Sequence, residues 1–144
     1  MTNRSSEKRA ERERDLEREL RGKERLLERE LSRKMKLADF RQDWKNRLRD
    51  DLSEIASLTV NPESMNDERI HQLNTRRGRV RLSLNLSEPH SIRLINAMND
   101  LAKTTQEDAG ENQTAFVAVG QELLKAEWDR LKEDLVQIEK MREQ

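Results

Sequence analysis

Two histidines and a few neighbouring carboxylates are the residues of this chain best suited to acid–base or metal chemistry. His71 and His90 are the only histidines, and neither has a second ligand-type side chain three or four residues further on. The adjacent acids Asp50 and Asp51, like those at 133 and 134, point apart on a helix and are typical of solvated faces. We therefore expect surface or capping roles for both histidines and no metal site.

Other catalytic patterns are missing from the sequence. It contains no HExxH, no glycine-rich phosphate loop, no GxSxG and no acidic calcium loop. It has no cysteine, which excludes disulfides, thiolate zinc sites and cysteine nucleophiles. We expect a protein that is not an enzyme, with no catalytic residue and no cofactor.

Arginines provide the other chemistry, which is anion binding. Residues 69 to 81 carry five arginines and no acid, and a second set steps along residues 14 to 33 at helical spacing. Either set could contact nucleic-acid phosphates or anionic lipid, although acids on neighbouring helices could also neutralise them. The chain has no tyrosine, and its four other aromatic residues lie on apolar stripes, so a stacking platform for single strands is not expected. The candidate anion-binding residues are Arg76, Arg77, Arg79 and Arg81.

The composition of the chain indicates which kind of fold positions the histidines, acids and arginines. Only 33% of the 144 residues are apolar and 40% are charged, but 29 basic and 29 acidic residues cancel. Low net charge argues against disorder and favours long helices with narrow apolar stripes. The N-terminus lacks the apolar segment of a secretory signal, and no run of residues is apolar enough to span a membrane. A cytoplasmic location is therefore expected.

Residues 1 to 36 are rich in arginine, glutamate and leucine and predict a helical, coiled-coil-like arm. Its leucines are spaced 4, 7 and 4, a sparse heptad-like seam that is interrupted by Lys23. Such a seam would be half-exposed in a monomer, so we expect it to be covered by a second copy or by a partner helix. The predicted partner-binding residues are Leu16, Leu20, Leu27 and Leu31.

The pattern changes at Phe40, where the same helix is expected to enter a packed domain spanning residues 37 to 144. Apolar side chains follow at spacings of 4, 4, 4 and 3 from Phe40 through Trp44 to position 55, and Leu37 widens this stripe. Pro62 predicts that the helix stops before residue 61. A second helix is expected from Ser64 or 66, although residues 79 to 86 also alternate like a strand. An isolated strand would have no pairing partner, which favours a helix there.

Two further helices complete the predicted domain. Ser87 is a candidate N-cap with Pro89 at an early position, and Ile92, Ile95 and 98 are expected to face inward. Residues 103 to 113 predict a polar loop, and the last helix is expected from about 114. Two tryptophans, Trp44 and Trp128, lie on the strongest stripes, so we expect them to share one core. The predicted inward positions of the last helix are Val117, Gly120, Leu124, Trp128, Leu131, Leu135 and Ile138.

Three segments resemble a family of uncharacterised bacterial helical proteins. They are "FRQDWKNRLRDDL" from Phe40, "VRLSLNLSEPHSIRLI" from Val80 and "LLKAEWDRLKEDL" from Leu123, and they occur in the same order as in that family. Members usually carry an apolar, membrane-spanning helix before the first segment, where this chain has its charged arm. The resemblance implies a helical fold and no activity, cofactor or catalytic residue.

These observations predict an all-α protein: an antiparallel bundle of about four helices preceded by an extended, charged helical arm. We expect a protein–protein interaction or scaffold protein that forms a homodimer, or binds another protein, through the arm. The alternative is an anion-binding module that attaches to nucleic acid or to the inner membrane surface through its arginine-rich faces. Nucleic acid is the less favoured partner, and any membrane contact would be peripheral.

Overall fold

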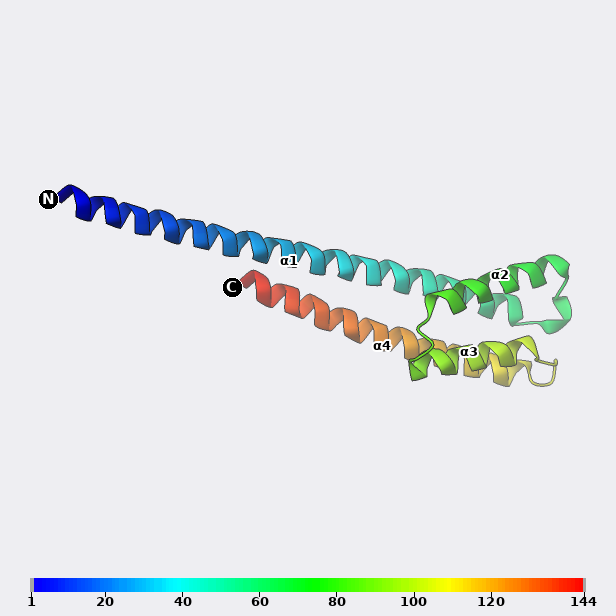
Figure 1. The fold of residues 1–144 in the computed structure, drawn as a ribbon. Helices are drawn as coiled ribbons and strands as arrows, with labels where there is room; N and C mark the ends of the chain where they lie inside the picture. Colours follow the sequence, from blue (N-terminus) through cyan, green and yellow to red (C-terminus); the bar gives the residue numbers. More distant parts are fainter. Residues whose placement is uncertain (1, 144) are drawn as a thin grey trace. The chain divides into compact units, whose positions relative to one another are not determined.

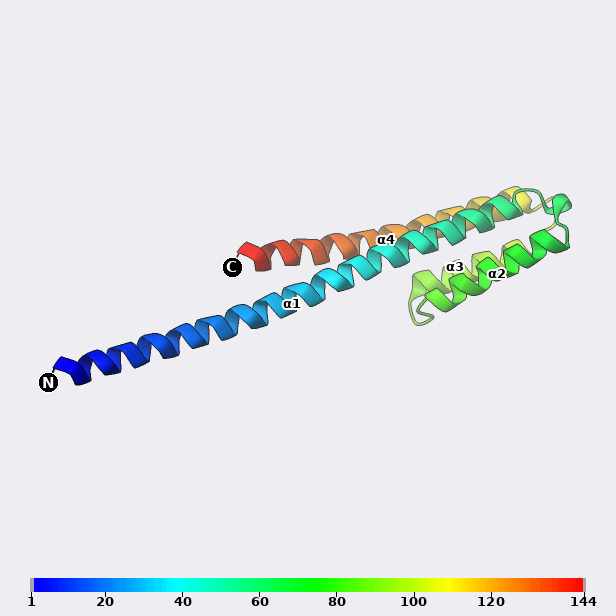
Figure 2. The same cartoon turned by 90° about the horizontal axis from the view of Figure 1, so that it is seen from above.

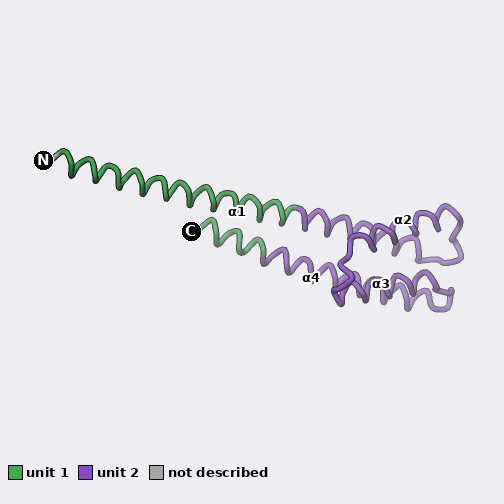
Figure 3. Tube along the Cα trace, viewed as in Figure 1, with its two compact units in different colours: residues 1–39, 134–144 green, residues 40–133 purple. Residues whose placement is uncertain are grey.

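A computed structural model describes residues 2–143, and the described chain is helical apart from short connections. It contains four α-helices and one turn of 3₁₀-helix, which confirms the predicted all-α class (Figure 1). The chain forms two compact units, coloured separately in Figure 3. The elements are α1 (Thr2–Thr59), η1 (Pro62–Ser64), α2 (Asp67–Ser83), α3 (Pro89–Ala102) and α4 (Ala109–Glu143).

Unit 1 consists of the α1 residues up to Asp39 and the α4 residues from Asp134 onward. The tail of α4, assigned from sequence to the bundle domain, therefore belongs with the arm. Within this unit, Nη2 of Arg142 lies 3.3 Å from the sulfur of Met35, so the two helices approach each other at that level. Despite Gly22, the arm forms one uninterrupted helix.

Unit 2, residues 40–133, is the four-helix bundle, and it begins at Phe40, where the apolar pattern changes. Its helices alternate in direction, so that each is antiparallel to the next along the chain (Figures 1 and 2). This up-down-up-down order follows from the short connections, which leave a helix no room to cross the bundle before it turns back. The predicted antiparallel bundle of four helices is confirmed.

The bundle core consists of aliphatic side chains from all four helices and one phenylalanine. Each large apolar side chain that is fully buried contributes roughly 1.5–3 kcal/mol to folding. Gly120 of α4 lets α1 approach closely, because a methyl group added there would lie 3.4 Å from Cδ1 of Leu52. The most deeply buried side chains are Leu48, Ile55, Val80, Leu94, Met98 and Phe116.

Asparagines and prolines set the boundaries of the first two helices as local sequence predicts. α1 ends at Thr59, before Pro62, and Asn61 caps the following 3₁₀ turn through a hydrogen bond from the amide of Glu63. Asn66 caps α2 by accepting from the backbone N–H of Arg69 at 2.9 Å. The ambiguous segment 79–86 is helical as far as Ser83 and is not a strand.

The later boundaries differ from the prediction. The N-cap of α3 is Glu88, because the Ser87 side chain instead bonds to Oδ1 of Asn85 at 2.7 Å. α4 begins at Ala109, inside the segment predicted as a loop. On α3, Leu94 is buried in the core, whereas Ile92, which was expected to face inward, is exposed.

The inward face of α4 matches the prediction only in part, because residues 120, 131 and 138 are buried as expected but others are not. Val117, Trp128 and Leu135 were expected to face inward but are exposed. Phe116 and Leu123, the neighbours of predicted positions, are buried in their place. Because α4 contains adjacent apolar residues, which lie about 100° apart around the helix axis, its sequence offers two alternative stripes.

The two tryptophans do not share one core, contrary to the prediction. Trp44 is half-buried against the bundle core, and its indole N–H donates to the backbone oxygen of Ser83 at 3.0 Å. Trp128 is 41% exposed and packs its ring over Nζ of Lys45 at 4.0 Å. Phe40 and Leu37, also expected on the inward stripe, are exposed.

Candidate functional site

The leucine seam of the arm is exposed in unit 1. Leu16 and Leu20 are each 58% exposed and Leu27 is 36% exposed, whereas Leu31 is half-buried. In the same unit Ala38 is buried. The apolar face of α1 is therefore partly covered at Leu31 and Ala38, with Met35 between them 40% exposed, and it is open over residues 16 to 27.

The arginine stripe of the arm lies on the opposite side of α1 from this seam. Two residues along an α-helix correspond to just over half a turn. Most stripe arginines stand two positions from a seam leucine, as Arg14 and Arg18 do from Leu16 and Arg29 does from Leu27. All of these arginines are exposed. A helix covering the seam would thus leave the stripe in solvent.

Two of the four candidate anion-binding arginines are paired with a buried acid. Asp51 of α1 is only 2% exposed, and its Oδ1 lies 2.8 Å from Nη1 of Arg76 and 3.4 Å from Nε of Arg79. The hydrogen bond to Asp51 raises the pKa of Arg76, against the opposing effect of burial. Asp51 was expected on a solvated face but is buried, because its position three residues after Leu48 and four before Ile55 places it on a buried stripe.

The other two candidate arginines share a neutral partner. Oδ1 of Asn99 on α3 accepts from Nη2 of Arg77 at 3.2 Å and from Nη2 of Arg81 at 2.6 Å. Burial lowers the pKa of Arg77, and the positive charge of Arg81 adds to this effect. The four predicted arginines of α2 therefore have partners on two different helices: Arg76 and Arg79 bond to α1, and Arg77 and Arg81 bond to α3.

A small pocket lies at the turn between α2 and α3. Its volume is about 190 Å³, and it is lined by Phe40 and Trp44 of α1, Asn85 and Glu88 of the turn, and Glu127 of α4, among others. These residues come from all three of the segments that carry the family resemblance. Segments far apart in sequence thus meet around one turn.

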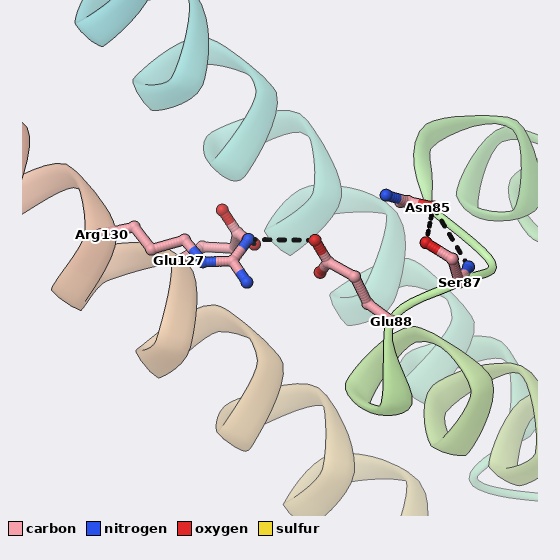
Figure 4. Close-up of polar contacts among 5 residues, drawn as sticks. All are labelled: Asn85, Ser87, Glu88, Glu127 and Arg130. Carbon is pink, nitrogen blue, oxygen red and sulfur yellow. Dashed lines mark hydrogen bonds and ion pairs between the residues drawn. The ribbon is translucent and has the colours of Figure 1, made fainter.

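An arginine fixes the two carboxylates at this pocket. Nη1 of Arg130 lies 3.2 Å from Oε1 of Glu88 and 3.1 Å from Oε1 of Glu127, which joins the turn to α4 (Figure 4). The hydrogen bond to Glu88 is the largest cause that raises the pKa of Arg130. The acids are engaged with this guanidinium, so the arrangement acts as a structural clamp.

The histidines and acids form no metal centre among residues 2–143. In this range no three potential ligands of the His, Cys, Asp or Glu type come together. His71 is exposed, and Nδ1 of His90 lies 2.9 Å from Nη2 of Arg93. Within the same range no helix has the length and apolar character needed to cross a bilayer.

Comparison with known proteins adds no family assignment. No protein-family profile, curated protein or solved structure matches the chain. The resemblance to the bacterial helical family therefore stays a prediction.

Proposed function

We propose that this chain is a cytoplasmic, non-enzymatic scaffold protein that self-associates through the arm seam. The observation that carries the proposal is the exposure of Leu16, Leu20 and Leu27 in helical register with the covered face of the same helix. Covering the exposed part of each leucine contributes roughly 1 kcal/mol, doubled by the equivalent side chain of the partner.

Unit 1 contains too little core to stand as a finished domain. Of its apolar side chains, only Ala38 and Ile138 are classed as buried among the described residues. Exposed apolar residues that recur along one face of a helix are typical of an interaction surface. The exposed large apolar side chains of the unit are Leu16, Leu20, Leu26, Leu27, Met35, Leu37, Leu135 and Val136.

A second copy running parallel is the occupant that we favour. In a parallel, in-register pair the three open leucines, Leu16, Leu20 and Leu27, each meet their own counterpart, and the arginine stripes of both copies stay outside the interface. In the antiparallel arrangement that matches the leucines, Leu16 would have to face Leu31, which is already half-covered within unit 1. Lys23 interrupts the seam, and a polar residue in a coiled-coil seam typically fixes register at a cost in stability.

Anion binding by the α2 arginines has less support. Arg76 and Arg79 pair with Asp51, and Arg77 and Arg81 bond to Asn99. A nucleic-acid backbone or lipid surface would have to compete with these internal contacts. The stripe on the arm lacks the aromatic residues of a stacking platform.

Light scattering of the purified chain tests the proposal. The expected result is a dimer of the 17.1 kDa chain that the double substitution Leu20→Asp with Leu27→Asp converts to a monomer. Leu82→Asp is the matched control, because Leu82 is 90% exposed on α2 and lies outside the seam. A wild-type monomer at every concentration would overturn the proposal. So would a dimer that the double variant leaves intact.

A further inference from the structure

A cavity in the bundle lies beside an arginine that has no acidic partner. The cavity has a volume of about 350 Å³, which falls at the small end of the range for ligand pockets. Met65, Ile70, Leu73 and Leu101 contribute apolar side chains to its wall, and Arg77 contributes the only charged one. The wall also contains three uncharged polar side chains, those of residues 59, 74 and 104. Its apolar part, next to a single cation, is suited to an amphipathic anion.

The hydrogen-bonding capacity of Arg77 is incompletely used. Its Nε is fully buried without a hydrogen-bond partner, the only such side-chain atom among the described residues. Its Nη2 bonds to Oδ1 of Asn99, but Arg81 bonds to the same oxygen. A buried donor without an acceptor is costly, and a neutral amide does not offset two positive charges.

The neighbouring arginine shows what Arg77 lacks. Arg76, one position earlier on α2, forms an ion pair with the buried carboxylate of Asp51. No acid of the described chain forms an ion pair with Arg77. Because Nε is buried from solvent, a carboxylate in the cavity would meet the Nη groups of Arg77, which can donate two parallel hydrogen bonds to it.

We propose that this cavity binds a free aliphatic monocarboxylate, with the carboxylate on Arg77 and the hydrocarbon tail against Met65, Ile70 and Leu73. The apolar wall disfavours inorganic phosphate, which would leave that surface uncovered. The site lies entirely within the bundle and does not depend on the arm seam, so its success or failure leaves the proposed self-association unaffected.

Isothermal titration of the intact chain with sodium octanoate tests the site. We expect saturable binding of one octanoate per chain and no measurable binding of octanol or octylamine at the same concentrations. Octanol lacks the charge that Arg77 would recognise, and octylamine carries the opposite charge. Absence of octanoate binding, or equal binding of octanol, would refute the site.

Two variants locate the binding within the cavity. Arg77→Gln should weaken octanoate binding by about tenfold or more, because a charge-assisted hydrogen bond is lost. Arg81→Gln is the matched control. Arg81 bonds to the same asparagine as Arg77 but does not line the cavity, so this variant should retain binding. Ala102→Leu narrows the cavity from a solvent-exposed position of its wall and should also weaken binding. Wild-type affinity in both Arg77→Gln and Ala102→Leu would exclude the cavity as the site.

Discussion

Nη1 of Arg76 lies 2.8 Å from Oδ1 of Asp51, a carboxylate that is only 2% exposed. This contact joins α2 to α1 beside the largely apolar core of the bundle. Because the acid is buried and the arginine side chain reaches it from the surface, the charge of Asp51 is neutralised within the protein. The contact therefore concerns the stability of the bundle and also occupies one of the cations considered for anion binding.

Asp51→Asn should destabilise the bundle. The substitution leaves Arg76 and Arg79 without their acid, and because both arginines are partly exposed we expect a loss of about 2 kcal/mol, less than for a fully buried pair. Urea denaturation followed by circular dichroism gives the free energy of unfolding. Asp50→Asn is the control at an exposed neighbouring position and should change that free energy by less than about 0.5 kcal/mol. Equal effects of the two substitutions would show that the pair does not stabilise the fold.

Gly78→Ala should stabilise the bundle. Gly78 lies within α2, and a methyl group there would meet no atom within 4 Å outside the local helix backbone, so only the helical propensity changes. The expected gain is up to about 1 kcal/mol. Gly120→Val provides the contrast, because Gly120 packs against Leu52 and a larger side chain should cost about 1–3 kcal/mol. Thermal denaturation distinguishes these outcomes, and a lower melting temperature for Gly78→Ala would contradict the packing described for α2.

Lys45 should make the stability of the bundle depend on pH in the alkaline range. The residue is only 4% exposed, and burial, with a contribution from Arg49, lowers the pKa of Lys45 from its ordinary value of 10.5. The folded chain then binds fewer protons at this group than the unfolded chain. The Lys45 contribution to the free energy of unfolding should therefore rise with pH from the lowered pKa up to about 10.5.

Lys45→Met isolates this contribution. Unfolding in urea at a series of alkaline pH values should show a smaller rise in stability for the variant than for the wild type. Lys125→Met, at an exposed position, is the control and should retain the wild-type rise. If Lys45→Met and the wild type follow the same curve, burial does not perturb this lysine.

The sequence was sufficient for the number of helices and for the boundary between α1 and α2, because these signals are local. Apolar spacing identifies α1, and asparagine and proline mark the end of α1 and the start of α2. Part of the inward face of α4 could not be predicted, because Phe116 precedes Val117 and Leu123 precedes Leu124, so two apolar stripes run side by side. Only packing against the other helices selects between them.

The same distinction applies to the candidate sites. The exposed arm seam could be predicted, since an apolar stripe on a highly charged helix needs no tertiary information to be recognised. The pairing of Asp51 with Arg76 and of Glu88 with Arg130 could not, because each joins residues from different helices. Both contacts depend on how the bundle folds. The contact between Asp51 and Arg76 attaches the arginine-rich segment of α2 to α1.

Disulfide trapping tests the central claim of self-association most directly, because the chain has no native cysteine. If two arms pair in parallel and in register, Leu20→Cys places two thiols opposite each other, and mild oxidation should yield a covalent dimer on a non-reducing gel. Leu82→Cys, exposed on α2, should remain a monomer at the same protein concentration. A Leu20→Cys chain that stays monomeric, or dimers that form equally in both variants, would contradict parallel, in-register pairing through the seam.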